Sequence, residues 1–263
     1  MSLRPCLLAA QTTDPQLNHG LALSHDGRTL YASNPHQVMA WGYNASSGSV
    51  YTSPEVIVSG MWNAMHSTRT VFVTSAGDLL VSRGSAANAD PVALNMTSGH
   101  CQIRAFSSTA NNQSYTSGKV VGWGLRNSVG IAEHPDTGIW SVENSVDNLQ
   151  RDGVDVHNDN PAEELNYHGN VSSPRGSNHG YPLCYTLWGT QDFPNLGNLT
   201  TGDQFAATGA EGAGLSGTVS DSLCNALFTP PVLSFQAHTA PLDIVFDSSG
   251  ENAYVSFHGS CKS

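Results

Sequence analysis

The apolar positions of this chain fall in short alternating runs, and the runs come in pairs separated by a turn that contains glycine. Alternation over so few residues predicts strands, and each pair predicts a β-hairpin. The pattern occurs four times, so we expect hairpins at residues 21–33, 70–82, 129–142 and 242–256. No long stretch rich in Ala, Leu, Glu and Lys favours a helix. We therefore predict an all-β fold.

The spacing of the hairpins favours a β-propeller. The turn glycines are Gly27, Gly77, Gly138 and Gly250, so the gaps are 50, 61 and 112 residues. Hairpins that recur about every 50–60 residues are typical of propeller blades. The last gap is about two such periods, which leaves room for a further blade. A β-sandwich with similar hairpins is the alternative.

The ends of the hairpins indicate where a site lies. Residues before the first strand and after the second strand of a hairpin meet at the same edge. We therefore expect these positions to share one face of the propeller. They hold much of the chain's histidine and arginine, whereas the opposite turns carry Asp, Ser and Gly. The residues are Asn18, His19 and Asn34; His66, Arg69 and Arg83–Ser85; Arg126, Asn127 and Glu143–Ser145; and His238, Thr239 and His258–Ser260.

The third hairpin carries the most suggestive chemistry. Arg126 and Asn127 come directly before its first strand, and the loop Glu143–Asn148 follows its second strand. An arginine, amides and exposed loop carbonyls at one edge make a plausible site for a planar anion and a hard cation.

Composition excludes some partners. The 263 residues carry a formal net charge of −11, which argues against nucleic acid. No apolar run approaches the length of a membrane span. The apolar run in Met1–Gln11 is too short for a convincing signal peptide. Yet five Asn-x-Ser/Thr sequons indicate a secreted lineage, and we predict an extracellular glycoprotein. The sequon residues are Asn44, Asn95, Asn112, Asn170 and Asn198.

The five cysteines show no spacing typical of a metal site. Cys184 and Cys224 flank a region rich in Gly, Thr, Asn and Leu, at about 183–232, that has no clear period. We predict an irregular surface insertion there, which a disulfide between these two cysteines would close. Five unrelated buried thiols are the alternative.

Eight motifs, each weak alone, are specific in their order. They are Asn18–Leu23, His66–Thr70, Leu80–Ser85, Gly99–Phe106, Gly124–Gly130, Asp159–Asn166, Asn178–Pro182 and Ala253–Ser260. With them the chain resembles the pyrroloquinoline-quinone-dependent sugar dehydrogenases of the soluble glucose and sorbosone dehydrogenase type. It looks most similar to the fungal pyranose dehydrogenase domains.

The resemblance implies a six-bladed propeller with pyrroloquinoline quinone and Ca²⁺ on one face. A sugar hydroxyl then loses its proton to a histidine while a hydride passes to the quinone. By matching motif, His66 resembles that base, and Arg126 and Asn127 resemble the pair that contacts the reactive quinone carbonyl. We predict Arg69, Arg83 and His258 as further cofactor-binding residues. A surface histidine and a structural salt bridge of Arg126 are the alternatives.

The resemblance also implies a metal set. Ser145 and Val146 occupy the loop whose backbone carbonyls bind Ca²⁺ in the family, and Glu164 is predicted to hold a second, structural Ca²⁺. The alternative for the pair Glu163 and Glu164 is a solvated acidic edge. A sugar substrate and a haem electron acceptor are the implied partners.

The chain departs from the family pattern at both ends. The family's first blade, before Asn18, is absent, and after Ser260 the chain reads Cys-Lys-Ser where the family continues into a final blade. We therefore expect residues 1–263 to form a single partial propeller of about four to five blades. An inactive propeller that binds carbohydrate or protein is the alternative function. A Ca²⁺-dependent hydrolase is another, and it would show a cluster of metal-binding carboxylates.

Overall fold

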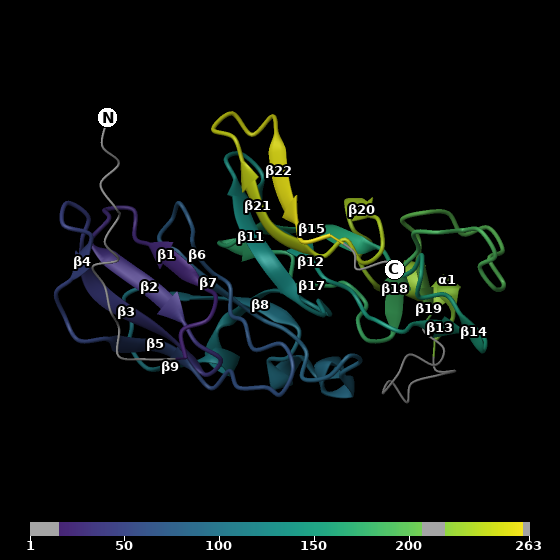
Figure 1. Cartoon of the computed structure of the whole chain (residues 1–263), viewed down its shortest axis with the longest axis horizontal. Helices are drawn as coiled ribbons and strands as arrows, with labels where there is room; N and C mark the ends of the chain where they lie inside the picture. The colour runs from purple at the N-terminus through teal and green to yellow at the C-terminus, as the bar shows by residue number, and fades with distance from the viewer. Residues whose placement is uncertain (1–15, 207–218, 260–263) are drawn as a thin grey trace.

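The computed structural model describes residues 16–206 and 219–259, and these residues are almost entirely β-structure (Figure 1). One α-helix, α1 (Asp221–Leu227), and three short 3₁₀ helices, η1 (Pro91–Leu94), η2 (Met96–Ser98) and η3 (Tyr115–Ser117), interrupt the strands. No helix in these two ranges is long and apolar enough to cross a membrane. The predicted all-β class is confirmed.

All four predicted hairpins form. They are β1 (Leu21–Leu23) with β2 (Thr29–Ser33), β6 (Val71–Val73) with β7 (Asp78–Arg83), β11 (Ser128–His134) with β12 (Gly138–Glu143), and β21 (Pro241–Phe246) with β22 (Ala253–Phe257). Each predicted turn glycine has a positive φ, between 67° and 109°. Glycine adopts this conformation without steric cost, which explains its recurrence at these turns.

Each of the first three hairpins is extended by two further strands to a four-stranded antiparallel sheet. The added strands are β3 (Gln37–Asn44) and β5 (Glu55–Ser59), β8 (Gln102–Ser107) and β10 (Lys119–Trp123), and β15 (Glu163–Asn170) and β20 (Leu233–Phe235). Short edge strands complete these sheets: β4 (Ser49–Val50), β9 (Gln113–Ser114), β16 (Ser173–Pro174) and β17 (Ser177–Asn178). Successive up-and-down sheets of this kind are propeller blades.

The core lies in layers between consecutive blades. On β7, Leu79 and Val81 pack in a cluster with Tyr31 of the first blade, whereas Leu80 packs in a cluster with Ile131 of the third. Successive side chains of a strand point to opposite faces, so a blade that is covered on both sides is apolar at every position. β11 lies directly against β21, and Ile244 joins the cluster of the third blade.

The long gap before the fourth hairpin contains no further blade among the described residues, so that part of the spacing argument is wrong. Strands β15 and β20 instead complete the third blade. The remaining chain forms a side layer of β13 (Gln150–Arg151), β14 (Val154–Asp155), β18 (Cys184–Thr186), β19 (Gln204–Ala206) and α1. This layer has its own apolar cluster, which includes Leu149, Tyr185 and Phe205.

The predicted disulfide is present. Cys184 in β18 is bonded to Cys224 in α1, 40 positions further along the sequence. Cys101 is a free, buried thiol. Cys6 and Cys261 lie outside the described residues. The alternative of five unrelated thiols is therefore wrong for the pair that closes the insertion.

Candidate functional site

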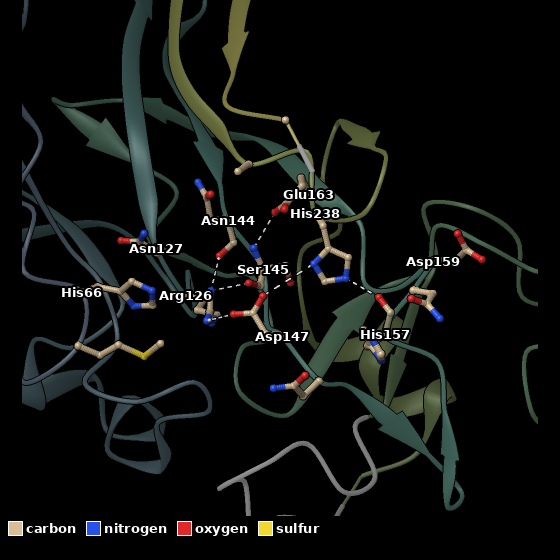
Figure 2. Close-up of a pocket in the computed structure, with 15 residues that line it drawn as sticks. His66, Arg126, Asn127, Asn144, Ser145, Asp147, His157, Asp159, Glu163 and His238 are labelled. Carbon is tan, nitrogen blue, oxygen red and sulfur yellow. Dashed lines mark hydrogen bonds and ion pairs between the residues drawn. The ribbon is translucent and has the colours of Figure 1, made fainter. Parts of the chain in front are cut away.

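A pocket opens where the ends of the second, third and fourth hairpins meet (Figure 2). Its volume of about 690 Å³ is in the range of cofactor and small-molecule sites. His66 lies at one end, Asp159 at the other, and Asp147 between them. The lining residues are Met65, His66, Arg126, Asn127, Asn144, Ser145, Asp147, Asn148, His157, Asn158, Asp159, Glu163, His238, Ala240 and Gly259. Asn18, His19 and Asn34 of the first hairpin do not line it.

Arg126 ties together the two loops at the centre of the pocket. Its side chain is almost fully buried, and its Nε and Nη2 donate to the carbonyl and the side-chain oxygen of Asn88, at 3.0 and 2.9 Å. Nη1 donates to the carbonyl of Ser145, and Nη2 also contacts Asp147 Oδ2 at 3.1 Å. The predicted salt-bridge alternative is therefore present, but Asp147 is a partner within the pocket rather than remote from it.

His66 is neutral and fixed in place. Burial, and then the positive charge of Arg126, lower the pKa of His66 to about 4. Its Nδ1 lies 2.8 Å from the hydroxyl oxygen of Ser85. Its Nε2 makes no hydrogen bond to any described residue. At neutral pH the His66 ring therefore carries no charge, and its Nε2 is available to a ligand, as a general base requires.

The far end of the pocket is built from His238, His157 and Asp159, none of which the sequence predicted as a catalytic, cofactor-binding or metal residue. His238 Nε2 is hydrogen-bonded to the carbonyl of His157, and His238 Nδ1 lies 3.8 Å from Asp147 Oδ1. The hairpin pattern had placed His238 on the correct face. The loop between β14 and β15 contributes His157 and Asp159. This loop is not part of the repeated hairpins, so the repeat could not predict its position.

Three buried glutamates lie where β12 ends and β15 begins, and one of them, Glu163, lines the pocket. Glu143 and Glu164 are paired across β12 and β15, and Glu163 is their neighbour. Burial raises the pKa of all three carboxyl groups, and that of Glu163 to about 7. Glu143 Oε1 accepts from the Arg126 backbone N–H at 2.6 Å, and Glu163 Oε2 accepts from that of Ser145 at 2.7 Å. The interpretation of Glu163 and Glu164 as a solvated acidic edge is wrong, because both are buried.

The predicted metal residues are placed differently from one another. Ser145 lines the pocket, whereas the Val146 side chain packs into the core of the side layer. Glu164 is buried and accepts from Thr186 Oγ1 at 2.6 Å and Asn166 Nδ2 at 2.9 Å. Within residues 16–206 and 219–259, no group of three or more His, Cys, Asp or Glu side chains could hold a metal ion. The Ca²⁺ set remains a prediction.

Three predicted cofactor residues lie outside the lining. Arg69 is fully buried and donates to the carbonyls of Met61 and His66, both at 2.6 Å. Arg83 donates to the carbonyl of Trp62 at 2.8 Å. His258 is exposed beside Gly259, which does line the pocket. Their cofactor contacts therefore remain predictions, and for Arg69 the structure shows support of the His66 backbone.

Comparisons with known proteins agree on one family. A family model described as TrAA12-like matches residues 6–263. The chain is 51% identical to a pyrroloquinoline quinone-dependent sugar dehydrogenase of Hypocrea jecorina (strain QM6a), over 96% of this chain and 60% of that protein.

Two solved structures are similar as well. The calcium structure of the Trichoderma reesei carbohydrate-active enzymes family AA12 has a TM-score of 0.88 at 51% identity, and the match covers 94% of this chain and 63% of that one. The holo form of the pyranose dehydrogenase PQQ domain from Coprinopsis cinerea has a TM-score of 0.85 at 36% identity, over 94% and 61%. The chain thus spans less than two thirds of each of these relatives. The predicted resemblance and propeller fold are confirmed.

Proposed function

Since the chain belongs to the TrAA12-like family, we propose that it oxidises a sugar hydroxyl with pyrroloquinoline quinone as the hydride acceptor and His66 as the general base. One observation carries the proposal: the pocket joins a neutral imidazole, with its Nε2 unpaired, to a buried arginine and an amide, Arg126 and Asn127. The names of the relatives above support the same chemistry. A pyranose is the substrate class that this predicts.

The residues divide the reaction between them. His66 Nε2 takes the proton of the sugar hydroxyl as the C–H bond on the same carbon breaks, which leaves a carbonyl. When bound, the quinone provides the two-electron acceptor that this oxidation requires. The N–H groups of Arg126 are all donated to protein acceptors, so its role would be to stabilise negative charge on the acceptor through its own positive charge. The Asn127 amide would donate a hydrogen bond at the same place. Because Arg126 is held by Asn88 and Asp147, its position needs no rearrangement during the reaction.

The pocket fits an anionic quinone only together with a cation. Asp147, Asp159 and Glu163 face the same space as Arg126, the one arginine among the lining residues. A polyanionic ligand there would be repelled unless a hard cation offset the charge. We propose Ca²⁺ in this role, held by carbonyls of Ser145 and Val146 and by the ligand, with Glu164 at a second, structural Ca²⁺.

Quinone titration tests the function. We expect the purified chain to bind pyrroloquinoline quinone in the presence of Ca²⁺ and not after chelation with EGTA, as followed by absorbance. We then expect dye reduction with members of a pyranose panel. Uptake without turnover on any sugar would favour the non-catalytic binder. Hydrolysis of lactones or esters without quinone would favour the hydrolase instead.

We propose a haem protein as the electron acceptor, on the family resemblance alone. A cytochrome added to the reduced enzyme should be reduced at a rate that depends on its concentration. No reduction by a panel of cytochromes, with dye reduction intact, would contradict this partner.

We also propose that the protein is secreted and N-glycosylated. The disulfide suits an oxidising compartment. All five sequon asparagines are exposed, and none lines the pocket. In Asn44 and Asn95, Oδ1 accepts a backbone N–H two residues on, at 3.0 Å in both. This leaves Nδ2, the atom that carries a glycan, without a hydrogen bond to any described residue.

Glycosylation is expected at Asn44 and Asn95 when the chain is made in a eukaryotic secretory host. Enzymatic deglycosylation in ¹⁸O-water followed by peptide mass spectrometry should show labelled aspartate at these positions. Asn88, which is outside a sequon, is the internal control. A secreted product that is unlabelled at every sequon would contradict the proposal.

A further inference from the structure

Ser85 lies between His66 and the Arg126–Asn127 pair and is hydrogen-bonded to both sides. Its backbone N–H donates to the carbonyl of Arg126 at 2.9 Å, and its carbonyl accepts from the backbone N–H of His66 at 3.1 Å. Gly84 makes this approach possible, because a Cβ there would lie 2.6 Å from Asn127 Oδ1 and 2.8 Å from His66 Cβ. The dipeptide Gly84-Ser85 therefore sets the spacing between the imidazole and the Arg126–Asn127 pair.

The Ser85 hydroxyl also determines which nitrogen of His66 carries the proton. Ser85 Oγ lies 2.7 Å from the carbonyl of Ala87 and 2.8 Å from His66 Nδ1. A carbonyl can only accept, so the single hydroxyl proton is donated to Ala87. The oxygen can then only accept from His66, which requires hydrogen on Nδ1. In a neutral imidazole, Nε2 is then the unprotonated nitrogen.

We propose that Ser85 is a positioning residue, which fixes His66 as the Nδ1–H tautomer so that the Nε2 lone pair is available in the pocket. The tautomer follows from the hydrogen bonds alone, and only its effect on turnover rests on the proposed function. Ser85 is fully buried and does not line the pocket, so it acts through His66 and not on substrate.

The tautomer is measurable without cofactor or substrate. Long-range ¹H–¹⁵N correlation spectra of the ¹⁵N-labelled full chain at neutral pH should show His66 with a protonated Nδ1 and an unprotonated Nε2. The His66→Ala spectrum assigns the signals. In Ser85→Ala, Nδ1 loses its acceptor, and we expect the Nε2–H form to appear. An Nε2–H tautomer in the unsubstituted chain, or an unchanged pattern in Ser85→Ala, would overturn the proposal.

Kinetics provide the second measurement. In Ser85→Ala we expect kcat to fall about tenfold with little change in KM, as for loss of one hydrogen bond that orients the base. Ser85→Thr keeps the hydroxyl and should restore both the spectrum and kcat. If the spectra show the Nδ1–H form of His66 but the chain oxidises no sugar, the tautomer assignment stands and the proposed function is refuted. Equal kcat in Ser85→Ala and the unsubstituted enzyme would overturn the positioning role.

Discussion

Replacing His66 with alanine is expected to lower sugar turnover by about 10²–10⁴-fold, the usual contribution of a general base. The substitution removes an imidazole that lines the pocket with Arg126 and Asn127 and whose Nε2 makes no hydrogen bond to the described residues. Quinone binding should change little, because Arg126 and its contacts to Asn88 and Asp147 do not involve the ring. Steady-state dye reduction by the chain loaded with quinone and Ca²⁺ measures the effect.

His36 offers a matched control, since it is an exposed histidine that does not line the pocket. His36→Ala should keep full turnover. Added imidazole should partly restore His66→Ala, because the cavity left by the side chain admits the free base. Full turnover in His66→Ala with bound quinone would show that another group takes the proton.

The same base predicts the direction of pH dependence. The pKa of His66 is lowered to about 4, first by burial and then by Arg126, so the imidazole is neutral above that pH. We expect kcat/KM to fall as the pH drops through about 4, where the free enzyme's base becomes protonated. A His66-dependent decline beginning near the ordinary histidine pKa of about 6.5 would contradict this environment.

The fold could be predicted from sequence where local patterns decide it. Alternation and turn glycines fix a hairpin within a dozen residues, and Gly27 and Gly138 mark their turns because a positive φ is needed there. The long gap before Gly250 led to a wrong expectation, because the number of residues in a gap does not show how those residues fold. Part of the segment between β12 and β21 completes the third blade with β15 and β20, and the rest folds as a side layer around Leu149 and Phe205 rather than as another blade.

The sequence predicted at which edge of the hairpins the site lies, but not which side chains at that edge point into the pocket. Arg126 and Arg69 both stand at the ends of hairpin strands, yet Arg126 lines the pocket and Arg69 is buried against backbone carbonyls. Asp147 was within the loop that the sequence singled out. His157 could not be located, because its position depends on how a loop packs and not on any repeat.

Removing the disulfide is expected to destabilise the chain by about 2–5 kcal/mol, as is usual for a native disulfide. The bond joins two cysteines 40 positions apart and anchors α1, whose Cys224 packs with Cys184 and Ala206. Without it the unfolded chain gains conformational freedom. The helix α1 is then held by the paired contacts between Arg151 and Asp221, at 2.7 and 2.6 Å, and by hydrogen bonds of Asp221 and Asn225 to β19.

Urea unfolding of the Cys184→Ala/Cys224→Ala double variant, compared with the unsubstituted chain, measures this loss. Cys101→Ala is the control, because it removes a buried thiol and leaves the disulfide in place. Neither Cys184 nor Cys224 lines the pocket, so the double variant should still bind quinone under conditions where it remains folded. An unfolding midpoint equal to that of the unsubstituted chain would mean that the noncovalent contacts of α1 hold the insertion without the cross-link. Reduction of the unsubstituted chain with dithiothreitol should reproduce the loss without any change of side chain, which separates the cross-link from the packing of the two sulfur atoms.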